Sequence, residues 1–228
     1  FFFVGLSVVP KGFLQKIPKI QEKEAFKEIF HFSKWLLLSF VATTIASRLD
    51  LLLLSRIKGS TEVGLYAVAL QLASVMPLLT GAITTVLLPR VSQMRQQQEF
   101  ISYIKKVLLG SGVLVLVLLP MVFLGDSLIN LFFGSRFNGS MAPFKVIFIS
   151  YLLALIINPV GQIIYALNRP QVFTALNYVQ LALSVALNLL LIPKFGIMGA
   201  ALTILLLHIL GGVFIGGYVA KIVKEVPS

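Results

Sequence analysis

The chain has 228 residues, of which 58% are hydrophobic and 12% are charged, against roughly 45–50% and 25% in soluble domains. This composition excludes an ordinary soluble domain and indicates a protein whose main solvent is lipid. The net charge of +11 does not indicate nucleic-acid binding, because Lys and Arg occupy short gaps between apolar runs instead of one soluble face. The chain contains no cysteine, which excludes disulfides and thiolate metal sites within it.

The first 32 residues divide into two stretches of different character. Residues 1–9 are apolar and lack an initiator Met or a basic leader, so we expect them to end a preceding transmembrane helix of a longer protein. Residues 10–32 interleave apolar side chains with lysines and glutamates. This pattern is typical of an amphipathic segment on a membrane surface, and we interpret it as a cytoplasmic linker.

Apolar runs long enough to cross a bilayer follow from residue 33 onward, since a transmembrane helix needs about 20 mostly apolar residues. The gap 125–145 is apolar but cut by Gly134, Asn138 and Gly139, and we expect a short interfacial helix there. We expect residues 221–228 to form a cytoplasmic tail. The sequence therefore predicts an all-α polytopic membrane protein with a six-helix bundle at 33–220. Its predicted spans are 33–57, 63–88, 107–124, 146–167, 173–192 and 199–220.

Basic residues in the gaps predict the orientation of the spans. Most of them fall on one side of the bundle, including Lys34, Arg90, Lys106 and Lys221. Because cytoplasmic loops carry an excess of Lys and Arg, this side and the C-terminus are predicted to face the cytoplasm, in the cytoplasmic membrane. The smaller group on the opposite side consists of Arg56, Lys58, Arg136, Lys145 and Lys194.

The first span carries two charged side chains at depth, Arg48 and Asp50. Each costs about 2.5–3.5 kcal/mol on an insertion scale. Residues two apart on a helix point about 160° away from each other, so we do not expect a direct ion pair. Arg48 lies about 21 Å along the helix from Lys34 and could extend its long stem to the outer surface. Asp50 has a short stem and is the better candidate for an ion, a proton or a partner.

The second and third spans differ in polarity. In the second, Gln71 shares a face with Ser74, Gly81 and Thr85, which is compatible with a cavity lining. The third span has Ser111 as its one polar side chain, so we expect it to be the most exposed to lipid.

The fourth and fifth spans each carry a polar stripe. One amide could simply join two helices, since interhelical hydrogen bonds are common in membranes. Two full-length stripes on successive helices nevertheless favour a hydrated cavity, because joining helices does not require polarity at every turn. At about 1.5 Å per residue the stripe of the fifth span is about 21 Å long. It consists of Thr174, Asn177, Gln180, Ser184 and Asn188, and the stripe of the fourth span consists of Tyr151, Ala154, Asn158, Gln162 and Tyr165.

Histidines and acidic residues are too few to predict catalysis. His208, in the last span, precedes Gly212 and Gly216, whose spacing allows close helix contact. We therefore favour a packed histidine over a proton relay. The chain offers no nucleophile with a base, no metal cluster and no carboxylate pair, so we predict that it is not an enzyme and holds no cofactor. It also lacks a Walker-type phosphate loop, so a gradient, the membrane potential or consumption of the substrate would have to drive transport.

Four ordered motifs carry a family resemblance. They are RLD at 48–50, VGLYAVA at 63–69, PRVS at 89–92 and NLLLIPKFGIMGAA at 188–201. With these motifs the chain resembles the C-terminal half of polysaccharide-biosynthesis or O-antigen-type flippases of the multidrug/oligosaccharidyl-lipid/polysaccharide (MOP) exporter superfamily. The resemblance covers nearly all of 33–220.

The resemblance implies a protein of about 12 to 14 helices in two similar bundles that face each other across a central cavity, with the N-terminal half missing here. It implies that an undecaprenyl-pyrophosphate-linked oligosaccharide moves from the inner to the outer leaflet by alternating access. Its partners would be membrane lipids and this polyprenyl-linked glycan. A pyrophosphate and a hydroxyl-rich glycan suit a cation and amides. We therefore expect the substrate path to be lined by Arg48, Asp50, Gln71, Asn158, Gln162, Asn177, Gln180, Ser184 and Asn188.

Two alternatives stay open at the level of sequence. The first is a cation-coupled multidrug exporter of the same superfamily, with Asp50 as the coupling carboxylate and H⁺ or Na⁺ as the coupling ion. The second is a structural membrane subunit without transport activity. This second alternative predicts that the two amide stripes face other helices with no hydrated cavity between them.

Overall fold

The computed structural model describes residues 19–227, with side chains for 26–27 and 29–227. The predicted end of a preceding helix at 1–9 and the first part of the predicted linker lie outside this range. Six helical stretches within it are long and apolar enough to cross a membrane. The prediction of an all-α polytopic membrane protein with six spans is confirmed.

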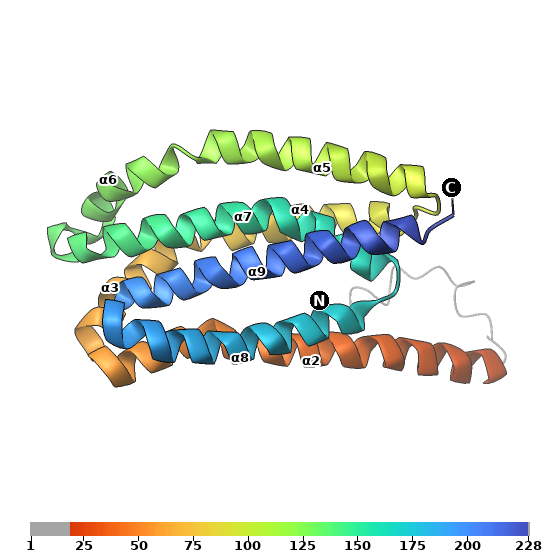
Figure 1. The fold of residues 1–228 in the computed structure, drawn as a ribbon, viewed down its shortest axis with the longest axis horizontal. Coiled ribbons are helices and arrows are strands. Elements are labelled where there is room, and N and C mark those ends of the chain that lie inside the picture. Colours follow the sequence, from red (N-terminus) through yellow and green to blue (C-terminus); the bar gives the residue numbers. More distant parts are fainter. Residues whose placement is uncertain (1–18, 228) are drawn as a thin grey trace, which may run out of the picture.

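The helices run side by side along one axis (Figure 1). α5 and α6 form one edge of the bundle in this view, and α2 and α8 form the other. α8 packs against both α2 and α9, whereas α7 packs against α9, α4 and α5. The elements are α2 (Lys19–Lys58), α3 (Ser60–Ala73), α4 (Val75–Val91), α5 (Gln97–Leu118), α6 (Met121–Phe133), the 3₁₀ helix η1 (Ser135–Ser140), α7 (Met141–Ala166), α8 (Pro170–Phe195) and α9 (Ile197–Lys224).

The first span belongs to a helix much longer than the bilayer requires. α2 has 40 residues, about 60 Å of helix, whereas the hydrocarbon core is about 30 Å thick. The described part of the predicted linker, 19–32, continues into the span without a break instead of forming a separate surface segment. The sequence explains this continuity, because neither Pro nor Gly occurs between Lys19 and Lys58.

The second span is two stacked helices, which the sequence did not lead us to expect. α3 ends at Ala73 and α4 begins at Val75, with Ser74 between them in a turn. Pro77 has no N–H to donate to the carbonyl of Ala73, so the helical ladder loses a bond at this point. The N–H of Ser74 instead bonds to the carbonyl of Gln71 at 3.2 Å, as in a tighter 3₁₀ turn.

The third span begins ten residues earlier than the predicted start of 107 and ends at Leu118 instead of 124. Its start is fixed by Glu99, whose Oε2 accepts the backbone N–H groups of Arg95 at 2.7 Å and Gln96 at 3.0 Å. Such an acceptor satisfies donors that a helix N-terminus would otherwise leave unpaired. Pro120 follows the end of the helix. The predicted interfacial gap is then filled by α6 and η1.

Two glycines shape the turns at one end of the bundle. Gly59, between α2 and α3, has a φ of 87°, which is unfavourable for side chains with a Cβ. Gly196, between α8 and α9, has a φ of 57°. Gly199 follows one turn later, where a Cβ would collide with the backbone carbonyl of Leu191. The 188–201 motif is therefore the sequence of a tight α8–α9 hairpin.

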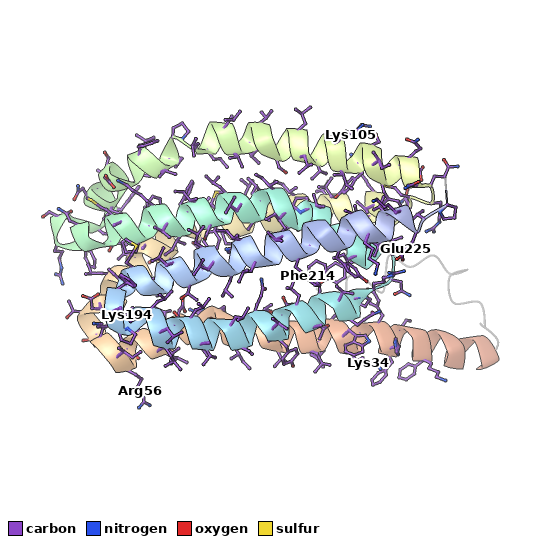
Figure 2. The ribbon with its side chains drawn as sticks, viewed as in Figure 1. Lys34, Arg56, Lys105, Lys194, Phe214 and Glu225 are labelled. Atoms are coloured by element: carbon purple, nitrogen blue, oxygen red, sulfur yellow. The ribbon has the colours of Figure 1, made fainter. Side chains whose placement is uncertain are left out.

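Charged side chains gather at the ends of the bundle. Figure 2 shows Lys34, Lys105 and Glu225 toward the end where α9 finishes, and Arg56 and Lys194 at the opposite end. Between the ends, the core consists of two apolar clusters. One surrounds Tyr66 and Ile147, the other Phe100 and Ile163, and α7 contributes to both. Basic residues that the sequence assigned to the same side of the membrane therefore lie at the same end of the bundle.

Candidate functional site

The polar stripe of α8 faces the two helices that flank it. Thr174 donates its hydroxyl proton to the carbonyl of Trp35 on α2 at 2.8 Å. One turn later, the side-chain amide of Asn177 donates to Ser39 Oγ, also on α2. Gln180 Nε2 donates in the other direction, to the carbonyl of Leu207 on α9 at 3.1 Å. These three hydrogen bonds join α8 to α2 and α9.

A small cavity of about 130 Å³, lined by both polar and apolar side chains, lies where α7, α8 and α9 meet. Asn158 of α7, Asn177 and Gln180 of α8, and His208 of α9 line it, together with the backbone of Gly211. This volume is well above the about 10–15 Å³ that one water needs, and polar walls favour hydration. The structure therefore brings together three of the predicted amides, from both stripes.

The stripe of α7 follows the same interface. Asn158 is exposed, and Gln162 Nε2 donates to its backbone carbonyl at 3.4 Å. At the two ends of the stripe the contacts are aromatic. Tyr151 meets His208 edge to face at 5.7 Å between ring centroids, and Tyr165 stacks on Phe173 at 4.6 Å. Asn158 and Gln162 are thus the more open amides of the two stripes.

The far end of the α8 stripe is closed. Ser184 and Asn188 are 4% and 1% exposed. Asn188 Nδ2 donates to Ser184 Oγ at 3.2 Å, within the same helix. Asn188 Oδ1 is buried and has no partner among the described residues. These two positions do not reach the cavity at Asn158.

Asp50 is held by a tyrosine that the sequence did not single out. It is 7% exposed, and its Oδ2 accepts the Tyr66 hydroxyl at 2.7 Å, while Oδ1 accepts the N–H of Leu51 at 2.8 Å. Tyr66 lies in α3 and is fully buried. Its place in the VGLYAVA motif was the one sequence signal that could have found it. This carboxylate therefore joins α2 to α3.

Arg48 lies on α2 and Gln71 on α3. Both side chains are exposed, and in the part of the chain that the structure describes neither forms a hydrogen bond or an ion pair. The hydroxyls of Ser47, Ser74 and Thr85, in contrast, each donate to a backbone carbonyl three or four residues earlier. Arg48 and Gln71 thus keep free donors on an exposed face.

The predicted site residues fall into three groups. Asn158, Asn177 and Gln180 line the cavity between α7, α8 and α9, and Gln162 lies one turn from Asn158 on α7. Asp50, Ser184 and Asn188 are buried in separate places. Arg48 and Gln71 are exposed within the predicted spans, and neither lines the cavity between α7, α8 and α9.

Several known proteins with similar sequences are named as glycan flippases or transporters. Residues 6–142 match the model of the family described as polysaccharide biosynthesis protein. The chain is 26% identical over 227 residues to the probable low-salt glycan biosynthesis flippase Agl15 of Haloferax volcanii, covering 96% of this chain and 48% of that protein. It is 24% identical over 186 residues to a putative O-antigen transporter of Shigella flexneri, covering 79% and 44%. The chain spans about half the length of these relatives.

The fold has a counterpart among solved structures. An outward-facing multidrug resistance MATE family transporter of the MOP superfamily superposes with a TM-score of 0.62 at 17% identity, over 83% of this chain and 44% of that one. At this identity the likeness concerns the fold alone. The family match covers more than half of the chain, and the helices are arranged as in a MOP transporter. The chain belongs to the polysaccharide biosynthesis protein family, with the fold of the MOP exporter superfamily.

Proposed function

We propose that the full-length protein is a flippase that moves lipid-linked oligosaccharides across the cytoplasmic membrane by alternating access. The relatives in sequence, two of which are named as a flippase and an O-antigen transporter, support a transporter of polysaccharide type. This chain is one bundle of that protein. A second bundle, outside the present sequence, completes the cavity.

The observation that carries the proposal is the exposure of Arg48 at membrane depth. Arg48 lies ten residues before Lys58 at the end of α2, about 15 Å along the helix. A charge at this depth is unfavourable against lipid, and no described residue pairs with it. Facing the second bundle, its planar guanidinium would instead meet a pyrophosphate or a sugar acid, to which it can donate two parallel hydrogen bonds.

The amides take different parts in the proposal according to their contacts. Gln71 is also exposed, on α3, and we assign it to the same path. Asn158 and Gln162 keep donors and acceptors that a glycan hydroxyl can use. Asn177 and Gln180 fix α8 between its neighbours, and the hydrated cavity beside them lets this interface adjust when the bundle moves.

The proposal includes an orientation. The end of the bundle that carries Lys34 and Lys105 faces the cytoplasm, where the positive-inside rule places an excess of basic residues. The C-terminus lies on this side. The lipid-linked glycan then enters from the inner leaflet and leaves at the end that carries Arg56 and Lys194.

Complementation of a flippase-null strain tests the role of Arg48. Full-length Arg48→Gln should lower surface glycan by more than tenfold and leave the protein level unchanged, and Arg48→Lys should restore part of the activity. Arg56→Gln is the matched control, because Arg56 is also exposed and lies on α2, but at its end. Equal activity of Arg48→Gln and wild type, together with full activity of Gln71→Ala, would contradict the proposed path.

The multidrug alternative makes a different prediction in the same strains. A cation-coupled exporter would lower the accumulation of a fluorescent cationic drug and have no effect on surface glycan. Asp50→Asn would abolish this export. Restoration of surface glycan without any change in drug accumulation supports the flippase.

A further inference from the structure

A large cavity lies away from the amide stripes, between α4 and α5. Its volume is about 850 Å³, in the range of about 300–1,000 Å³ that small-molecule sites occupy. The two helices diverge from the short connection at 92–96, and α7 packs against both of them. Neither the amide stripes nor Arg48 contributes to the lining, so the proposed transport path leaves this cavity unexplained.

Charged and polar side chains line the end of the cavity nearest that connection. Arg90 and Lys106 contribute positive charge, and Gln98 and Ser102 contribute donors. Both basic side chains are exposed, and within 19–227 neither forms an ion pair or donates a hydrogen bond. Glu99 is the one acidic lining residue, and it is occupied by the N–H groups of Arg95 and Gln96. The mouth therefore keeps an excess of unpaired positive charge.

The deeper part of the cavity is mostly apolar. Ile83, Leu87, Val107 and Leu114 line it, together with Ser111 next to Gly110. Gly110 lies in the lining, and a Cβ built on it would meet no atom within 4 Å. The missing side chain leaves an open channel along α5 in the direction of the bilayer centre.

We propose that this cavity binds an anionic phospholipid of the inner leaflet. Its phosphate lies between Arg90 and Lys106, and one acyl chain follows the apolar wall past Gly110. The two ends of the cavity suit the two parts of such a lipid. Guanidinium and ammonium groups bind phosphate, and the aliphatic wall packs against a hydrocarbon chain. Basic pockets between helices on the cytoplasmic side are known to take such headgroups. The choice of the inner leaflet rests on the proposed orientation, whereas lipid binding in this cavity does not depend on the proposed transport activity.

Binding is measured on the delipidated full-length protein by native mass spectrometry. Phosphatidylglycerol is compared with phosphatidylcholine of identical chains. The anionic lipid should bind at least fivefold more tightly, and soluble glycerol phosphate should not displace it, because the phosphate alone lacks the acyl contact. Equal binding of the two lipids would overturn the proposal, and so would displacement by glycerol phosphate.

Matched variants test the two parts of the site separately. Arg90→Gln with Lys106→Gln should remove most of the preference for the anionic lipid, whereas Lys105→Gln, next in sequence but outside the lining, should keep it. Gly110→Leu should fill the channel and weaken binding of both lipids at least threefold. Gly112→Leu is its control, because Gly112 also has open space around it and does not line the cavity.

The remaining outcomes decide against the site or against its occupant. If Lys105→Gln is as harmful as Lys106→Gln, the lipid responds only to general surface charge. If Gly110→Leu binds like wild type, no acyl chain lies in the cavity. If polyprenyl phosphate binds and phosphatidylglycerol does not, the cavity belongs to the transported lipid. A complementation defect of Arg48→Gln is independent of all three, so failure here leaves the proposed function standing.

Discussion

The interface of α7, α8 and α9 and the open face of α2 and α3 use polar residues in opposite ways. At α8, Asn177 donates to a hydroxyl of α2 and Gln180 to a backbone carbonyl of α9, and a small cavity lies beside them. On the open face, Arg48 and Gln71 have no partner among the described residues. Polar side chains that are hydrogen-bonded to another helix therefore contribute to packing. Polar side chains without a partner, such as Arg48, are candidates for contact with substrate. We therefore expect changes in the interface to alter stability, and changes on the open face to alter transport.

The largest effect on stability should come from the turn that holds α8 against α9. Gly199→Ala places a Cβ against the backbone of Leu191, which cannot move aside as a flexible side chain would. Overpacking of this kind costs about 1–3 kcal/mol. Gly216→Ala, on the same helix in open space, should be neutral or stabilising because alanine favours helix. Thermal unfolding of the full-length protein in detergent measures both, and equal midpoints would contradict the tight hairpin.

Loss of the Tyr66 hydroxyl should come next. Tyr66→Phe leaves Asp50 Oδ2 buried without its donor, at a cost of about 1–3 kcal/mol. The double variant with Asp50→Leu should recover part of this loss, because both polar partners are then removed. Tyr178→Phe is the control, since Tyr178 is 42% exposed. Equal unfolding midpoints for Tyr66→Phe and Tyr178→Phe would show that the hydrogen bond does not join α2 to α3.

A smaller effect is expected at the contact between α8 and α2. Asn177→Leu and Ser39→Ala each remove the same interhelical hydrogen bond, and such bonds contribute about 0.6 kcal/mol on average in membranes. The double variant should lose no more than the larger single loss, and a double-mutant cycle in detergent measures this coupling. Additive losses would mean that the two side chains do not interact.

The smallest effect on stability, and the sharpest test of the comparison, comes from single cysteines. The chain has no cysteine of its own, so replacements in a cysteine-free full-length protein report one position each. Gln71→Cys should react quickly with a membrane-impermeant thiol reagent if, as proposed, it lines a path that opens to water. Asn188→Cys should react at least tenfold more slowly because Asn188 is buried. Similar rates at both positions would contradict the contrast between the exposed Gln71 and the buried end of the α8 stripe.

The sequence predicted the spans better than the partners of their polar residues. Apolar length alone identified six membrane crossings, because lipid imposes that length. The break at Ser74 depends on the missing N–H of Pro77, and the early start of α5 depends on the capping carboxylate of Glu99. Neither feature changes the mean hydropathy of a span, so apolar length did not predict them. The period of the α8 stripe placed its residues on one side of the helix. It could not show that Asn177 turns to α2 and Gln180 to α9, because that depends on which helices flank α8.

Residues missed by the sequence reasoning share one property. Tyr66, Ser39 and Tyr103 have ordinary neighbours in the sequence, and their importance comes from atoms far along the chain. Tyr103 on α5, for example, donates its hydroxyl to the carbonyl of Pro159 on α7 at 2.7 Å. Pairing across helices cannot be predicted from the period within one helix.

The length of α2 has a mechanical consequence. A helix that runs from Lys19 to Lys58 without Pro or Gly behaves as one stiff rod, and only part of it fits within the hydrocarbon layer. Its projecting segment and the turn that carries Arg48 must therefore tilt together. Binding of a partner or a lipid headgroup to the projecting segment would change the tilt of α2. The orientation of the Arg48 side chain would change with it.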